Sequence, residues 1–172
     1  MTTKSRHTCQ PQGLWALLLG LWVALSPLEV RAEQDEHLFA LSGAYVLSEA
    51  HGGGLGLAYQ YGLTDFWNLA VSSGWDMSEE GQGLHLGLGT LYHIDAFQWV
   101  PYLSARLCGY GRMPASEGED SILYGFGGAF GAGVDYRPSR RWGVGLYSEY
   151  HVLFVGEIHD QLNAGVRFNL YF

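Results

Sequence analysis

The sequence of 172 residues contains very little cysteine and lysine. Beyond residue 32 the only cysteine is Cys108, and a single thiol forms no internal disulfide, so a disulfide-stapled secreted domain is not expected. We expect Cys108 to be a small packed residue. Residues 33–172 contain no lysine and carry six Arg against sixteen Asp or Glu, a net charge of −10. This acidity argues against a nucleic-acid partner.

Long apolar runs are also absent. The longest, GLWALLLGLWVAL at residues 13–25, is too short for a transmembrane helix. It follows a basic start, is ended by Pro27, and precedes the sequence VRA at residues 30–32. This arrangement predicts a secretory signal peptide over residues 1–32, cleaved after Ala32. Residues 33–172 are then long enough for one domain.

Helical periodicity is missing from residues 33–172, and alternation of apolar with small or polar residues takes its place. Alternation of this kind predicts β-strands. The pattern recurs in eight runs, at residues 38–48, 53–62, 66–76, 83–94, 99–110, 122–136, 142–154 and 161–172.

The two faces of these strands differ in size. Leu84, Leu86 and Leu88 alternate with His85 and Gly87, and 23 of the 140 residues after Ala32 are glycine. A closed sheet of eight strands has a narrow interior, so the small residues must face inward. The bulky apolar residues then form a continuous outer belt, which would aggregate in water and is required in a bilayer. We therefore expect the last strand to place Phe172 in lipid at the rim.

The connections between the strands fall into two classes. Three are short turns flanked by aromatic residues, whereas the other four are longer on average and acidic. In outer-membrane barrels short turns face the periplasm and long loops face outward, and aromatic residues gather at the membrane interface. The short turns are expected at 62–65, 95–98 and 137–140, and the acidic links at 48–54, 76–83, 112–120 and 155–161.

Together with the signal peptide, YGLTDFWNLAVSSGW, VPYLSARLCGYG and the terminal VRFNLYF resemble the OmpA/OmpX-like family of small outer-membrane barrels. The resemblance implies an all-β fold, an eight-stranded antiparallel up-and-down transmembrane β-barrel in the outer membrane of a Gram-negative bacterium. It also implies that Tyr171 and Phe172 belong to a C-terminal signal read by the outer-membrane insertion machinery. Expected partners are outer-membrane lipid and lipopolysaccharide, and a monomer is expected. Such barrels serve as adhesins, enzymes, anchors and small pores, so fold alone leaves the role open.

Five charged or titratable residues fall on the inward face: Arg106, Asp135, Glu149, His151 and Arg167. A buried charge needs a partner, so we expect a polar network that fills the lumen. Since the last two strands are neighbours, Glu149 and Arg167 are expected to meet. The alternative is a narrow ion path gated by rearranging ion pairs.

The sequence predicts no catalytic residue, cofactor or metal site. Ser148 and His151 are three residues apart on a strand and should face opposite sides, which disfavours a lipid A-modifying enzyme. Acidic residues of the outer loops, including Asp76 and the group Glu117, Glu119 and Asp120, match no calcium motif and are interpreted as a solvated surface. His51, His85, His93 and His159 are too dispersed to indicate a metal site.

Arg137, Arg140 and Arg141 cluster at the third short turn. We interpret them as a turn solubilised by charge, with contact to peptidoglycan or phospholipid headgroups as the alternative. A structural or surface-interaction role is expected overall; a small pore and a lipid A-modifying enzyme are the alternatives.

Overall fold

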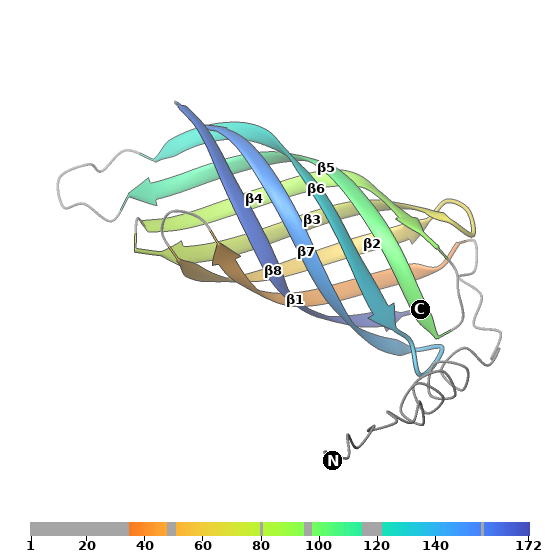
Figure 1. Ribbon diagram of the computed structural model, residues 1–172. Helices are drawn as coiled ribbons and strands as arrows, with labels where there is room; N and C mark the ends of the chain where they lie inside the picture. Colours follow the sequence, from red (N-terminus) through yellow and green to blue (C-terminus); the bar gives the residue numbers. More distant parts are fainter. Residues whose placement is uncertain (1–34, 48–50, 80, 95–97, 115–121, 156) are drawn as a thin grey trace, which may run out of the picture.

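The computed structural model describes residues 35–47, 51–79, 81–94, 98–114, 122–155 and 157–172. The predicted signal peptide, residues 1–32, lies outside these ranges and stays a prediction. The described chain forms eight antiparallel strands that close into one barrel (Figure 1). They are β1 (His37–Leu47), β2 (Gly52–Gly62), β3 (Trp67–Ser78), β4 (Gly81–His93), β5 (Trp99–Pro114), β6 (Leu123–Tyr136), β7 (Trp142–Val155) and β8 (Glu157–Tyr171).

Each strand pairs with its neighbours in the chain, and the last pairs with the first. At this closing seam the backbone N–H of Phe172 donates to His37 O at 2.9 Å, and the N–H of His37 donates to Phe172 O at 3.2 Å. Closure leaves no strand edge unpaired, which is the condition for β-structure in a bilayer. The eight alternating runs of the sequence correspond one to one to the eight strands, so the predicted fold is confirmed.

Bulky apolar side chains cover the outer surface, as predicted. Leu86 is 61% exposed, Phe130 62% and Phe168 41%. Residues at the alternate positions point inward and are smaller or polar. A soluble protein would bury these side chains in a core, so the exposed belt requires hydrocarbon around it. Within the described residues no helix is long and apolar enough to cross a bilayer.

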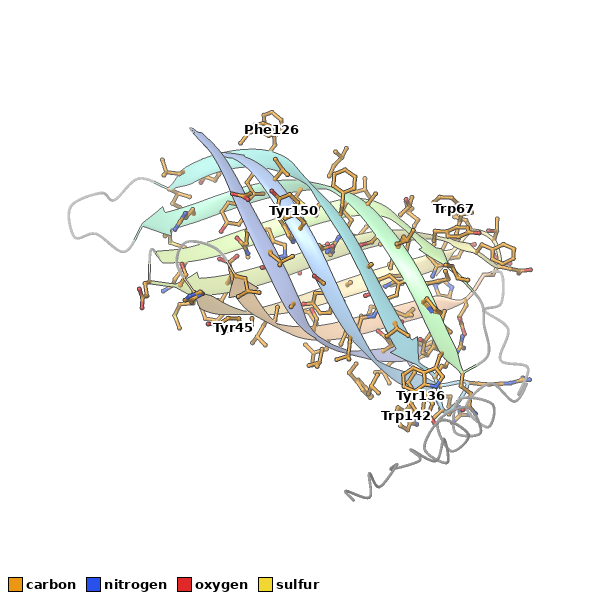
Figure 2. All side chains as sticks on the ribbon, in the orientation of Figure 1. Tyr45, Trp67, Phe126, Tyr136, Trp142 and Tyr150 are labelled. Atoms are coloured by element: carbon orange, nitrogen blue, oxygen red, sulfur yellow. The ribbon has the colours of Figure 1, made fainter. Side chains whose placement is uncertain are left out.

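Aromatic residues gather at both ends of the belt. Trp67, Tyr136 and Trp142 lie towards one end in Figure 2, and Tyr45 and Phe126 towards the other. The sequence analysis predicted only the first group. Ten residue steps separate Tyr136 from Phe126 on β6, which at roughly 3.4 Å per residue and a tilt of about 40° span about 26 Å of membrane thickness. This height matches the apolar band of outer-membrane barrels.

The short turns are held by hydroxyl groups. In the turn between β2 and β3, Thr64 Oγ1 accepts the backbone N–H of Trp67 at 3.0 Å. Between β6 and β7, Ser139 Oγ accepts the N–H groups of Arg141 and Trp142, each at 3.2 Å. Hydroxyls that satisfy turn N–H groups favour tight connections. Residues 95–97 of the remaining short turn lie outside the described ranges.

All four acidic connections are shorter than predicted, and two of them are much shorter. β3 continues to Ser78 and β4 begins at Gly81, whereas β7 continues to Val155 and β8 begins at Glu157. The prediction of longer links was wrong because strand pairing depends on backbone hydrogen bonds, which continue past the apolar belt through polar residues. Gly81 has a φ of 135°, a conformation that favours glycine at this tight connection.

Candidate functional site in the barrel lumen

The barrel interior contains the five residues that the sequence placed on the inward face. Arg106 lies on β5, Asp135 on β6, Glu149 and His151 on β7, and Arg167 on β8. All except Arg106 are buried. Their side chains meet in two separate groups along the barrel axis, so the structure brings together some of the five and not others.

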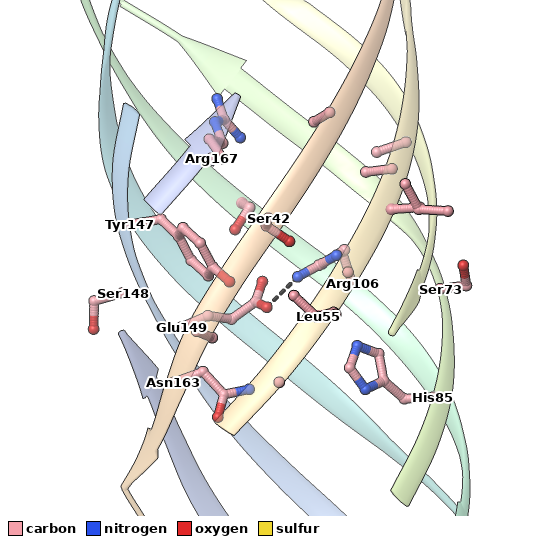
Figure 3. Close-up of a pocket in the computed structure, with 18 of the residues that line it drawn as sticks. Ser42, Leu55, Ser73, His85, Arg106, Tyr147, Ser148, Glu149, Asn163 and Arg167 are labelled. Atoms are coloured by element: carbon pink, nitrogen blue, oxygen red, sulfur yellow. Dashed lines mark hydrogen bonds and ion pairs between the residues drawn. The ribbon is translucent and has the colours of Figure 1, made fainter. Parts of the chain in front are cut away.

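The first group is centred on Glu149. Its carboxylate forms an ion pair with Arg106 (Figure 3). The same guanidinium donates from Nη1 to Ser72 Oγ at 2.6 Å. His151 Nε2 lies 3.0 Å from Glu149 Oε2. Arg106 therefore reaches from β5 across the lumen to both β3 and β7. Because the guanidinium and the carboxylate project inward from β5 and β7, their ion pair fills part of the lumen at this level.

The second group pairs Arg167 with Asp135. Arg167 Nε donates to Asp135 Oδ1 at 2.7 Å, and a second bond from Nη2 makes the pair bidentate. The guanidinium also lies 3.8 Å from the centroid of the Tyr102 ring. In the strand register Gly145 stands between the two partners, opposite Arg167 on one side and Asp135 on the other. Its missing side chain leaves room for the ion pair.

The expected contact between Glu149 and Arg167 was wrong. The register places Glu149 opposite Asn163 and Arg167 opposite Gly145. Four residues on β7 separate these two levels, a distance of roughly 13 Å along the strand. Glu149 pairs instead with Arg106 of β5, and Arg167 pairs with Asp135 of β6, each two strands away.

A third ion pair closes the end that carries the short turns. Arg137 is buried, pairs with Glu36, and donates from Nη1 to Glu36 Oε2 at 3.0 Å. Its guanidinium lies 3.8 Å from the Tyr171 ring centroid. The interpretation of Arg137 as part of a solvated turn was therefore wrong, whereas Arg140 and Arg141 are exposed. Arg137 turns inward because a carboxylate and an aromatic face are available there.

Asp76 and His85 form a further polar group at the opposite end. The sequence placed Asp76 in a predicted acidic loop. In the structure β3 continues past Asp76, and the Asp76 side chain points inward and is buried. Tyr110 Oη donates to Asp76 Oδ1 at 3.2 Å, and His85 Nδ1 lies 3.8 Å from Asp76 Oδ2. The alternation through Ser72 and Gly74 was the signal that could have shown this.

A cavity of about 90 Å³ lies inside the lumen between these groups. The strands β1 and β2 contribute small residues to its wall, and β5, β7 and β8 contribute larger polar ones. A cavity of this size with polar groups in its wall accommodates several water molecules. Its polar lining includes Ser42, Gln60, Ser104, Tyr147, Asn163 and Arg106.

Polar atoms without a protein partner lie near the end with the short turns. Asn169 is fully buried, and neither its Oδ1 nor its Nδ2 has a hydrogen-bond partner among the described residues. The same holds for Nε2 of the buried His93. Buried polar groups of this kind are normally satisfied by enclosed water. The lumen is thus a polar interior closed by ion pairs.

Ser148 and His151 do not form a hydrolytic pair. Ser148 is exposed on the outer wall while His151 is buried inside, and Figure 3 shows Ser148 pointing away from the lumen. A nucleophile and its base need hydrogen-bond contact. The described residues contain no group of three or more His, Cys, Asp or Glu arranged to hold a metal ion. Glu117, Glu119 and Asp120 lie outside the described ranges.

No protein-family model matches this sequence, and no curated protein is similar to it. Solved structures are similar in fold. Neisserial surface protein A superposes with a TM-score of 0.69 at 18% identity, covering 81% of this chain and 98% of that one. This chain has the fold of a small outer-membrane β-barrel. The N-terminal barrel domain of Pseudomonas aeruginosa OprF gives 0.66 at 20% identity, covering 80% and 98%.

The outer membrane enzyme PagL has the same barrel fold. It superposes with a TM-score of 0.55 at 14% identity, covering 76% of this chain and 98% of that one. The predicted OmpA/OmpX-like architecture is therefore confirmed. Because the fold is shared by an enzyme and by a surface protein, the function must be argued from the lumen and the surface of this barrel.

Proposed function

We propose that this barrel is a non-catalytic integral protein of the outer membrane of a Gram-negative bacterium, with a structural or surface-interaction role. The observation that carries the proposal is the lumen closed by three ion pairs, Arg106–Glu149, Arg167–Asp135 and Arg137–Glu36. A filled lumen leaves the outer strand ends and loops as the surface available to partners. The predicted signal peptide and the apolar belt support the location.

The character of the outer end limits the kind of partner. Glu79 and Asp160 are exposed there, and the sequence adds Glu117, Glu119 and Asp120 in the connection between β5 and β6. Like charges oppose binding of a sulfated or phosphorylated polyanion. A basic partner surface, or lipopolysaccharide phosphates bridged by divalent cations, fits this charge.

Assembly through the C-terminal strand is part of the proposal. Tyr171 points inward beneath Arg137, whereas Phe172 is 73% exposed on the outer surface. Phe172 is therefore the member of the pair accessible to the insertion machinery from outside. Removing Phe172 is expected to lower the amount of assembled barrel in cells, while the purified protein still refolds in detergent.

The proposed role is tested on the full mature chain in cells and in bilayers. Cell fractionation with a heat-modifiability gel should place a folded barrel in the outer membrane. Mass spectrometry of lipid A should show the same acyl pattern with and without the protein. A changed acyl pattern would overturn the non-catalytic role, and a barrel found in another fraction would overturn the location.

A small pore is the second candidate, because the cavity of about 90 Å³ lies on the axis between ion pairs. Conduction would require Arg106 to leave Glu149 and Arg167 to leave Asp135. Wild-type protein in planar bilayers is expected to give no current steps above background. Glu149→Ala frees Arg106 and is the comparison variant. Steps in the wild type that change in conductance in Glu149→Ala would favour the pore.

A further inference from the structure

An apolar groove crosses the membrane-facing wall near the short turns. It has a volume of about 640 Å³ and extends over strands from β5 to β2. The two strands that flank the turn between β6 and β7 both contribute to it, through Tyr136 and Val144. Other lining side chains are Trp99, Leu146, Val166 and Phe168.

The groove exists because its floor includes a glycine. Gly43 faces the membrane between Leu55 of β2 and Val166 of β8 in the strand register. A Cβ added at Gly43 would meet no atom within 4 Å, so the wall is recessed there. Larger residues surround the recess, and an acyl chain is the apolar ligand that a bilayer supplies to such a surface.

Two exposed arginines stand at the turn next to the groove. Arg140 and Arg141 lie between Tyr136, which lines the groove, and Trp142. The Trp142 ring stacks on Phe168 at a centroid distance of 6.3 Å, which joins the turn to the groove wall. Figure 2 shows Tyr136 and Trp142 together at this end of the barrel.

Hydrogen bonds fix the backbone of the turn that carries the two arginines. Ser139 Oγ accepts the N–H of Arg141, and Arg137 Nη2 donates to the carbonyl oxygen of Arg140 at 3.2 Å. Within the described part of the chain neither Arg140 nor Arg141 forms an ion pair with a carboxylate. Arg137, by contrast, forms an ion pair with Glu36. The two free charges are unusual in a domain with a net charge of −10.

We propose that this groove and the two arginines bind an anionic glycerophospholipid of the leaflet that faces the short turns. The arginines hold the headgroup phosphate, which they match in charge and geometry. An acyl chain occupies the groove. The aromatic pair Trp99 and Tyr136, with ring centroids 4.7 Å apart, lies at the interface where the glycerol backbone sits. The inference rests on the membrane-spanning fold and not on the closed lumen.

The test uses refolded protein in vesicles containing brominated phosphatidylglycerol or brominated phosphatidylcholine. Bromine quenches tryptophan fluorescence, and Trp99 and Trp142 lie at the groove. Wild-type protein is expected to prefer phosphatidylglycerol by up to about 25-fold, since each of the two basic residues near the surface contributes about fivefold. In the double variant Arg140→Gln, Arg141→Gln the preference should vanish. In the variant Gly43→Leu, quenching by both lipids should fall, while the preference for phosphatidylglycerol should remain.

Asp65→Asn is the matched control, because it removes a charge from a different short turn and leaves the groove unchanged. It should retain the full preference. No preference in the wild type, or the same preference in the double arginine variant, would overturn the proposal. A gain in preference in Asp65→Asn as large as the loss per arginine would also overturn it, since that result indicates diffuse attraction set by net charge alone. A heat-modifiability gel on each variant separates loss of binding from loss of the barrel itself.

Discussion

At the scale of single residues, the lumen depends on glycines that make room for charges. Gly145 lies between Asp135 and Arg167, and Gly133 lies beneath the Tyr102 ring that covers Arg167. In an eight-stranded barrel the interior is so narrow that large inward side chains can be placed only beside small ones. The glycine content of the sequence is therefore a packing requirement of its charged lumen.

Gly145→Ala is expected to destabilise the barrel. A Cβ at this position would overlap the Asp135 carboxylate and push it away from Arg167. Overpacking of this kind costs about 1–3 kcal/mol. The measurement is the urea midpoint of the refolded protein in detergent. Gly43→Ala is the control, since its Cβ enters open space, and its midpoint should be unchanged. Equal midpoints for both variants would contradict the role of Gly145.

Asp135→Asn is expected to leave the buried Arg167 without its countercharge. Removing one partner of a buried ion pair costs about 3–5 kcal/mol. The double variant Asp135→Asn, Arg167→Met removes both charges and should regain part of this loss, because no unpaired charge remains. Urea unfolding of the two single variants and the double variant gives the coupling energy. Additive losses would show that the two side chains do not stabilise each other.

At the scale of elements, each strand presents one face to hydrocarbon and the other to a polar interior. The faces are set by alternation, so the same substitution has different consequences at neighbouring positions. β5 illustrates this, because Arg106 reaches across the lumen while Leu107 is 76% exposed to the outside. A slip of one residue in the register of β5 would turn Arg106 towards the hydrocarbon and Leu107 into the lumen.

Leu107→Arg is expected to destabilise the barrel in a bilayer. Leu107 lies on the outer face of β5 within the apolar belt, where an arginine costs more than at the interface and up to about 2–4 kcal/mol at the bilayer midplane. Gln82→Arg is the comparison, because Gln82 is exposed at the outer end of β4, where the cost falls to about 0–1 kcal/mol. The free energy of unfolding in lipid vesicles measures the cost of each substitution. Equal costs at the two positions would place Leu107 outside the hydrocarbon.

At the scale of the whole molecule, closure of the sheet and the apolar outer belt together determine where the protein is stable. Every strand is hydrogen-bonded on both sides. The apolar side chains of the outer belt are not covered by other described parts of the chain. The barrel is therefore one cooperative unit that is stable only with lipid or detergent around it. Acidic residues predominate at the outer end, whereas the end with the short turns carries Arg140 and Arg141 together with acidic residues such as Asp65.

The mature chain is expected to refold as a monomer in detergent and to precipitate when the detergent is removed without lipid. The cause is the outer belt, which would aggregate in water. Size-exclusion chromatography before and after detergent removal, with a heat-modifiability gel, measures this. A water-soluble monomer without detergent would contradict the membrane assignment, even if its strands were intact.

The sequence by itself determined the number of strands, their approximate limits and the face on which each residue lies. Period-two alternation is a local property, since successive side chains of any strand point to opposite sides. For this reason the inward positions of Glu149 and Arg167 and the outward positions of Leu86 and Phe130 could be predicted.

Only the tertiary structure decided which charges meet. Alternation does not specify how far one strand is shifted against the next, so it could not show that Gly145, rather than Glu149, lies opposite Arg167. The inward turn of Arg137 likewise depends on Glu36, which is distant in sequence and is brought near by closure of the barrel. Pairing across a lumen is set by register and closure, and these arise only when all eight strands are hydrogen-bonded together.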